Sequence, residues 1–434
     1  MSVFVFTAIM KRLNICPLLQ SSFLLMLILR HSFIFIAALI VSVSMSLQRE
    51  AMKRAAATSS STDGSAPAAA SSSPSSSFAI PAAARRQSHF SPLGWEHYFE
   101  SSARVYTATP GNSFRVYRLG SVGPVLILLH GGGMCALSWS LFAKEVARLC
   151  ACRIIAMDLR EHGESHTTTP DDFSLDAMAQ DVVQVFSVLY PSENPPTFVI
   201  GHSMGGAIAT HIAAKNMISS LVGLVVLDVV EGSALDALSS MTNVIRNRPK
   251  SFKSVTQAIE WSLRTGHTHN VEAARVAMPG QVREIHDDGQ NLLAPSISHI
   301  LEEEAGESIL GAATTASGGP TYVWRMDLSK TQPFWLEWFT GLSNKFLTAR
   351  ASKMLILAGM DRLDKELTIG QMQGKFQLDI LPECGHSLHE DKPEKVGGLV
   401  AQHLVRHRFA DPTTAYSAAK FSAGIPPRPV QHNA

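Results

Sequence analysis

The sequence is poor in cysteine and has no excess of charge of one sign. Its 434 residues include only 5 cysteines, an odd number, whereas small secreted domains that depend on disulfides carry dense, even sets. The simpler interpretation is a reducing compartment. The formal net charge is +1, and the sequence has neither the cysteine and histidine spacing of a zinc site nor a basic stripe with interleaved aromatic residues. We therefore expect no nucleic-acid partner.

Long uncharged apolar runs are also missing. The most apolar segment, residues 21–47, is interrupted by Arg30 and His31, and a membrane-spanning helix needs about 20 largely uncharged residues. Basic residues flank the segment on both sides, so the positive-inside rule gives no orientation. Two interpretations stay open. Either residues 1–54 hold a membrane anchor or targeting signal, or translation starts at a downstream methionine and the segment is absent from the protein.

The sequence does have enough apolar residues for a large core, since 46% of them are hydrophobic. Residues 55–89 are dominated by alanine, serine and proline. They predict a disordered linker, because such a segment buries too little surface to order itself. Residues 411–434 have a similar composition and predict a disordered tail. The folded domain is therefore expected at residues 90–410.

Short apolar runs recur through this domain, with helical patterns between them. Met178, Val182, Val185 and Leu189 mark one face of an amphipathic helix. The alternation predicts an α/β fold with a mostly parallel sheet flanked by helices, and an active site at the carboxyl ends of the strands. The expected strands are PVLILLH (124–130), CRIIAMDL (152–159), TFVIGHS (197–203), LVGLVVLD (221–228), KMLILAGMD (353–361) and residues 376–381.

A candidate nucleophile stands between one of these strands and the next helix. The sequence GHSMG (201–205) matches the G-x-S-x-G pattern in the strand-to-helix context that a nucleophile elbow requires. The glycines are needed because the turn is too tight for side chains to pass the neighbouring backbone. An idle serine in a tight turn is the alternative. We predict that Ser203 is a nucleophile.

A nucleophilic serine needs support for the oxyanion that forms when it attacks. The loop HGGG (130–133) follows the first expected strand, and a triple-glycine loop can direct backbone N–H groups at a developing negative charge. The N–H of Met204, at the start of the helix, would join it. We expect the oxyanion hole to consist of Met204, Gly131 and Gly132, with Gly133 in the same loop.

The base and the acid are expected after later strands. His386, in LPECGHSLHEDKP, is the expected base, whereas His389 is interpreted as a surface histidine. The chain order Ser, Asp, His leaves both Asp228 and Asp361 as candidates for the acid that orients the imidazole. Generic hydrolase architecture favours Asp361. Asp158 precedes the serine and is expected to organise a loop.

Longer stretches carry a more specific signal. Together with the motifs above, LDVVEGSALDAL, RPKSFKSVTQAIEWSLRTG and AGMDRLDKELTIGQMQGKFQLDILPECGHSLHED resemble the protein phosphatase methylesterases, from about residue 90 to 409. The resemblance implies the α/β-hydrolase fold and a serine esterase without metal or organic cofactor. It also implies the substrate: the methyl ester on the C-terminal leucine of the type-2A protein phosphatase catalytic subunit, in the cytoplasm or nucleus.

The resemblance assigns the site residue by residue. It places the nucleophile on Ser203, the histidine on His386 and the acid on Asp228, which overrides the generic preference for Asp361. Asp361, with Arg362 and Asp364, is then expected to hold the loop beneath the histidine by local ion pairs. The resemblance further implies a triad that is misaligned in the free enzyme and aligned by the phosphatase.

A long insertion, residues 229–352, is the expected source of a lid and partner surface. Its aromatic residues either cover a peptide-binding site or form the core of the lid itself; they are Trp324, Trp335, Trp338 and Phe339. Residues 283–320 are acidic and then rich in glycine and alanine, and we expect a mobile loop there.

Two other functions fit the same residues. A carboxylesterase for small esters would keep the chemistry, and a translocated N-terminus would suit it. A phosphatase-binding regulator would keep the fold as a scaffold without turnover. Localisation tests the first alternative, and replacement of Ser203 tests the second.

Overall fold

The computed structural model describes residues 89–285 and 320–422. These residues belong to one compact unit, which spans Ala79–Ala434. Several expected segments lie outside the described residues: the N-terminal segment 1–54, nearly all of the linker 55–89, most of the loop 283–320, and residues 423–434. Within the described ranges, no helix is both long enough and apolar enough to cross a membrane.

The central sheet has eight strands in the order β1-β2-β4-β3-β5-β6-β10-β11. The pairs β1–β2 and β2–β4 are antiparallel, and the other pairs are parallel. The mostly parallel sheet and its six expected strands are confirmed, whereas β1 and β2 were not predicted. The strands are β1 (Ser101–Tyr106), β2 (Ser113–Leu119), β3 (Val125–Leu129), β4 (Arg153–Met157), β5 (Thr197–His202), β6 (Leu221–Leu227), β10 (Ser352–Leu357) and β11 (Gln377–Ile380).

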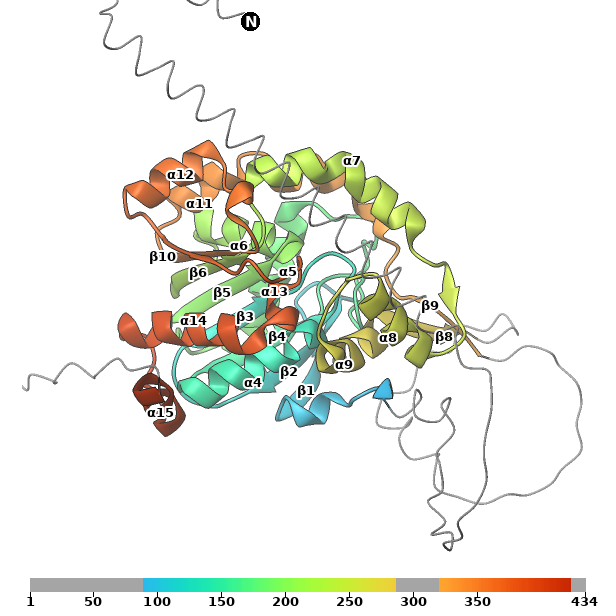
Figure 1. The fold of residues 1–434 in the computed structure, drawn as a ribbon, viewed down its shortest axis with the longest axis horizontal. Helices are drawn as coiled ribbons and strands as arrows, with labels where there is room; N and C mark the ends of the chain where they lie inside the picture. The colour runs from blue at the N-terminus through green and yellow to red at the C-terminus, as the bar shows by residue number, and fades with distance from the viewer. Residues whose placement is uncertain (1–88, 286–319, 423–434) are drawn as a thin grey trace, which may run out of the picture. The chain divides into compact units, whose positions relative to one another are not determined.

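Helices cover both faces of this sheet (Figure 1). One face carries α5 (Leu175–Leu189), α6 (Met204–Ala214) and α11 (Leu342–Thr348), and the other carries α4 (Ser140–Leu149) and α14 (Pro393–Arg406). α12 (Lys365–Met372) contacts α11. The domain also has the short elements η1 (Trp95–His97), η2 (Ala136–Trp139), η5 (Met360–Arg362) and α13 (Leu388–Asp391).

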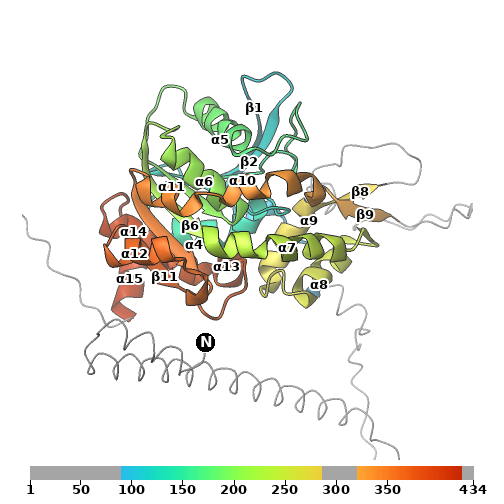
Figure 2. The ribbon, with the colours of Figure 1, turned by 90° about the horizontal axis from the view of Figure 1, so that it is seen from above.

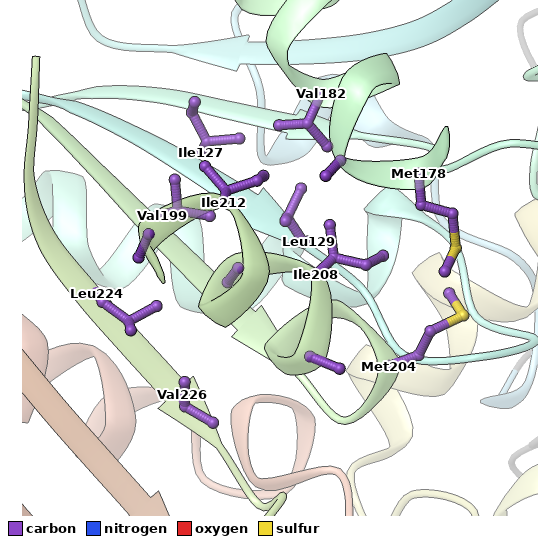
Figure 3. Packing of buried hydrophobic residues seen from close by; sticks show 14 of the residues in the cluster. Ile127, Leu129, Met178, Val182, Val199, Met204, Ile208, Ile212, Leu224 and Val226 are labelled. Carbon is purple, nitrogen blue, oxygen red and sulfur yellow. The ribbon is translucent and has the colours of Figure 1, made fainter. Parts of the chain in front are cut away.

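Alternation along the strands divides the core into two layers. In β3, Ile127 and Leu129 face α5 and α6, whereas Leu126 and Leu128 face the α4 side. Figure 3 shows Ile127 beside Ile212 and Leu129 beside Ile208, both isoleucines from α6. A central parallel strand is buried on both sides, so its sequence is a continuous apolar run.

The expected amphipathic helix is α5. Ser174 precedes it with extended backbone, and its side chain accepts a hydrogen bond from the N–H of Ala177, which satisfies a free donor of the first turn. Met178, Val182 and Val185 are buried, as the spacing predicts.

The insertion adds helices and a small sheet with strand order β7-β9-β8. Figure 2 shows α8, α9, β8 and β9 gathered at one end of the domain. Phe252, Ala258 and Met278 belong to their own small core. The elements are α7 (Glu231–Asn247), β7 (Ser251–Phe252), α8 (Val255–Arg264), α9 (Val271–Gln281), β8 (Val282–Ile285), β9 (Thr321–Trp324), η4 (Leu328–Phe334) and α10 (Trp335–Phe339).

The aromatic residues of the insertion divide between two cores. Trp335, Trp338 and Phe339 are buried in the main core beside α5 and α6, which favours a packing role for them. Trp324 instead packs against Phe252 and Trp261 in the insertion.

The prediction of a disordered tail from residue 411 is wrong for residues 411–422. The N–H of Ala151 donates to the carbonyl of Asp411, the N–H of Thr413 donates to Leu149, and a helix, α15 (Thr414–Ser422), follows and contacts α4. Tyr416 is buried. Composition alone missed this helix because backbone pairing with the end of α4, together with one aromatic anchor, holds it.

Candidate active site

Ser203 occupies a strained turn between β5 and α6. Its φ is 52° and its ψ is −118°, a region that residues other than glycine seldom adopt and that costs on the order of 1–3 kcal/mol. The N–H of Ser203 donates to the carbonyl of Leu227, 3.0 Å away, on the neighbouring strand β6. A Cβ atom at Gly201 would collide with the backbone of Gly205, and one at Gly205 with the backbone of Leu129. The expected need for both glycines is thus explained by contact with backbone.

Asp228 and His386 are brought together at the same edge of the sheet. Asp228 follows β6, has a φ of 53° and is buried. Its Oδ2 atom lies 2.7 Å from Nδ1 of His386, a half-exposed side chain, and its Oδ1 accepts from the N–H of Ala358 at 2.9 Å. A carboxylate can only accept, so Nδ1 carries the proton and Nε2 of His386 is left as the basic nitrogen.

The serine and the histidine are not hydrogen-bonded to each other in the described part of the structure. Among the described residues, His386 has no hydrogen bond to Ser203, and its carboxylate partner is Asp228. The nucleophile and base of a working triad need hydrogen-bond contact, although this contact is often looser before substrate binds.

The expectation that Asp361, Arg362 and Asp364 form local ion pairs is wrong. Arg362 pairs with Asp228, on the same oxygen that His386 contacts. Asp364 caps α12 by accepting from the N–H of Leu367. The 3₁₀ turn η5 faces Arg362 toward the end of β6, so the guanidinium reaches a buried carboxylate instead of its chain neighbours.

Three of the expected oxyanion donors differ in what they bind. Within the part of the chain that the structure describes, the N–H groups of Met204 and Gly132 donate to no other residue, but the N–H of Gly133 donates to Nε2 of His162 at 3.0 Å. Gly133 is therefore not available to an oxyanion. Gly131 accepts at its carbonyl from Met134 and from Nδ1 of His130, and these bonds fix the loop.

Two neutral histidines fix the glycine loop by accepting hydrogen bonds. Nε2 of His130 accepts from the N–H of Leu159 at 2.9 Å, and Nε2 of His162 accepts from Gly133. Burial lowers the pKa of His130 well below its usual range and lowers the pKa of His162 to about 4. An imidazolium cannot accept a hydrogen bond, so the loop depends on both rings staying neutral. The sequence analysis assigned no role to His162, and no local pattern points to one.

His389 is not the surface histidine that was expected. It is fully buried, with its ring 4.2 Å from the ring of Trp139 and 4.7 Å from that of His202. His202 in turn donates from Nε2 to the carbonyl of His386 at 2.9 Å, which positions the backbone that carries the expected base. The short helix α13 begins at Leu388 and turns His389 inward.

Asp158 organises loops, as expected. Its carboxylate accepts from the N–H of Ala136 at 2.7 Å and from the N–H of Glu164 at 2.9 Å. Burial raises its pKa to about 6. It thereby connects the segment after β4 to the segment that follows the glycine loop. In residues 89–285 and 320–422, no group of three or more histidine, cysteine or acidic side chains could hold a metal ion.

Comparison with known proteins defines the class. Residues 126–399 match the model of the alpha/beta hydrolase family, and the chain belongs to that family. Solved structures share the fold: E-2-(acetamidomethylene)succinate hydrolase has a TM-score of 0.52 at 16% identity, covering 70% of this chain and 99% of that chain. A peroxisomal alpha-beta-hydrolase from Saccharomyces cerevisiae has a TM-score of 0.50 at 14% identity, covering 75% and 95%.

Within this class, similarity to one group of enzymes extends over most of the chain. Protein phosphatase methylesterase 1 of Homo sapiens is 48% identical over 344 residues, 75% of this chain and 88% of the relative. The probable protein phosphatase methylesterase 1 of Caenorhabditis elegans is 41% identical, covering 79% and 84%, and the Schizosaccharomyces pombe protein is 38% identical, covering 72% and 85%. The chain belongs to the protein phosphatase methylesterase family and is a carboxylic ester hydrolase.

Proposed function

We propose that this enzyme removes the methyl ester from the C-terminal leucine carboxylate of the type-2A protein phosphatase catalytic subunit. The observation that carries the proposal is the 48% identity across 88% of a relative named protein phosphatase methylesterase. The strained serine and the Asp228–His386 pair supply chemistry that suits an ester.

The proposed reaction follows acyl transfer. The hydroxyl of Ser203 attacks the ester carbonyl while Nε2 of His386 takes its proton, and buried Asp228 stabilises the imidazolium. The N–H groups of Met204 and Gly132, with that of Gly131 beside them, stabilise the oxyanion. Methanol leaves with a proton from His386, and water, deprotonated by the same nitrogen, then releases a free carboxylate and restores Ser203.

Alignment of the serine with the histidine is part of the proposal. The absence of a hydrogen bond between Ser203 and His386 in the described residues supports a free enzyme that is not yet set for turnover. Binding of the phosphatase would bring the two side chains into contact. Small esters, which lack the phosphatase surface, would then be poor substrates.

Loss of the methyl ester from methylated phosphatase catalytic subunit tests the proposal with the full chain. Ser203→Ala is expected to lower kcat on the order of 10⁶-fold, and Asp228→Asn about 10⁴-fold. Asp361→Asn is the matched control and should stay close to the unmodified enzyme. Cleavage of p-nitrophenyl esters without demethylation would instead favour a small-ester carboxylesterase. Tight phosphatase binding by an unmodified chain that turns over neither ester would favour a non-catalytic regulator.

The location of the enzyme belongs to the same proposal. A cytoplasmic or nuclear enzyme would meet the phosphatase directly, and residues 21–47 would act as a membrane anchor if they are present in the protein. Fractionation of cells that express the full chain or a chain that begins at Met52 tests this. Recovery of the full chain inside the secretory pathway would argue against the phosphatase as substrate.

A further inference from the structure

Arg248 lies beside the glycine loop with its guanidinium stacked on an aromatic ring. It follows α7, and its Cζ atom is 3.6 Å from the ring centroid of Trp324. The indole of Trp324 is itself fixed, because its Nε1 donates to the carbonyl of Pro249 at 2.8 Å. A stacked guanidinium keeps its N–H donors in the plane of the group, where they point to the sides of the ring.

This guanidinium has no acceptor in the part of the chain that the structure describes. Among the described residues, Arg248 makes neither an ion pair nor a side-chain hydrogen bond; its recorded contact is the Trp324 ring. Asp327 is close enough to affect it, but that carboxylate accepts from the N–H and the hydroxyl of Ser329. Burial lowers the pKa of Arg248 to about 10, so the side chain is still charged at neutral pH. The side chain is partly buried, and a charge that is partly withdrawn from water without an acceptor is unfavourable.

The guanidinium of Arg248 lies beside the expected oxyanion hole. A Cβ atom at Gly133 would lie 3.2 Å from Nη1 of Arg248 and 2.8 Å from Leu328. A Cβ atom at Gly132 would lie 3.7 Å from Leu328 and 3.8 Å from Sδ of Met204. The guanidinium therefore borders the same glycine loop that faces the residue after the nucleophile.

Other guanidiniums around the site differ from Arg248, because each has an acceptor. Arg160 pairs with buried Asp181 at 2.6 Å, Arg362 pairs with Asp228, and Arg325 donates to the carbonyl of Val282 at 2.9 Å. Those side chains are explained by the fold. Arg248 has no such acceptor within residues 89–285 and 320–422, so its donors are available to a bound molecule.

We propose that Arg248 is a specificity residue that binds a carboxylate of the peptide whose C-terminal ester Ser203 attacks. The inference rests on the proposed function and adds that the bound peptide presents a carboxylate to Arg248. The ester itself is neutral, so the carboxylate has two sources: an aspartate or glutamate upstream of the ester, or the C-terminal carboxylate that hydrolysis creates. A guanidinium fork suits either one, since it donates two parallel hydrogen bonds to a carboxylate.

A charge scan with synthetic peptides tests the first source. Peptides that end in leucine methyl ester carry glutamate, or the isosteric glutamine, at one upstream position at a time. The full chain is expected to favour glutamate over glutamine at one position by about 10- to 100-fold in kcat/KM, the usual effect of a charge-assisted hydrogen bond. In Arg248→Met the ratio should fall to about one, and in Arg248→Lys it should be intermediate. The ratio cancels any general loss of activity.

Arg246→Met is the matched control. Arg246 stands two residues earlier, in the last turn of α7, and is exposed, so this variant removes the same charge from the same region without touching the stacked guanidinium. It should keep the glutamate preference of the unmodified chain. A preference that survives in Arg248→Met, or that falls equally in Arg246→Met, would overturn the role of Arg248.

The second source is tested by product inhibition. Inhibition of p-nitrophenyl ester cleavage is compared for a free-acid peptide without acidic side chains and for its C-terminal amide. Stronger inhibition by the free acid, by about 10-fold or more and only with Arg248 present, would assign the new carboxylate. This arm needs no peptide ester turnover, so it still tests Arg248 if the proposed function fails. No glutamate preference and no difference between free acid and amide would refute the inference.

Discussion

Two helices, α6 directly after Ser203 and α7 shortly after Asp228, show how differently the hydrolase core and the insertion are built. In α6, every residue but the last is buried, whereas α7, with 17 residues, has none that is fully buried. The first helix is held by the sheet and its neighbouring helices, and the second rests on the surface with Val244 64% exposed. Regions with few buried contacts open most easily. The groups proposed to react are therefore on the rigid part, and Arg248, directly after α7, is on the adaptable part.

Acid should damage the rigid part most. The folded pKa is about 4 for His162 and about 3 for His389, each because of burial, compared with about 6.5 in the unfolded chain. The unfolded chain therefore binds more protons between these values. The contribution of each of these histidines to stability is fully present above pH 6.5 and falls toward pH 4 by about 1.4 kcal/mol per pH unit. Urea unfolding at several pH values measures the slope.

One variant isolates a single histidine from this slope. Glutamine in His162→Gln still offers an acceptor to Gly133 but does not titrate, so the slope should decrease by about 1.4 kcal/mol per pH unit. Exposed His97 provides the control, since His97→Gln should leave the slope unchanged. An unchanged slope in His162→Gln would mean that this ring is not held neutral.

Truncation of a side chain should cost more stability in α6 than in α7. Ile208 is fully buried in α6, and Ile208→Ala is expected to cost about 2–5 kcal/mol through lost contacts and a residual cavity. Val244→Ala on α7 should change stability by about 0.5 kcal/mol or less. Denaturant unfolding measures both. Equal losses would show that α7 is as much a part of the cooperative core as α6.

The turn that carries the serine should tolerate no side chain at Gly205. Gly205→Ala would force apart the start of α6 and the end of β3, at a stability cost of about 1–3 kcal/mol. Activity should fall about 100-fold from misplacement of the nucleophile. Gly398→Ala in α14 is the control, because no heavy atom lies within 4 Å of the added Cβ. Full esterase activity of Gly205→Ala would contradict this account of the turn.

The smallest effect is expected at Arg362. It supports Asp228 without contacting substrate, so Arg362→Met should lower kcat about tenfold and leave KM unchanged. Arg362→Lys should recover part of the loss by restoring the charge. Exposed Arg350 gives the control variant, Arg350→Met. A change confined to KM would instead place Arg362 at the substrate.

Local patterns predicted the parts of the molecule that local sequence determines. The buried parallel strands form apolar runs, and the turn at Ser203 needs its two glycines. The sequence could not show that β1 is a strand, because its burial pattern lacks a continuous apolar side. Contacts between residues far apart in the sequence could not be predicted either. Arg362 binds a carboxylate 134 residues away, and His162 accepts a hydrogen bond from a glycine 29 residues away. Such contacts depend on the finished fold.

The backbone at Ser203 also bears on how the sequence can change over generations. Its φ of 52° and ψ of −118° suit glycine, which pays no steric penalty there. Glycine at this position would make the chain more stable and, on the proposed mechanism, remove the hydroxyl that forms the acyl enzyme, because proteins often give up stability where activity requires strain. In a lineage that kept the fold only as a scaffold, replacement of Ser203 by glycine would not be selected against through loss of activity. A serine retained at this position thus records continued selection for turnover.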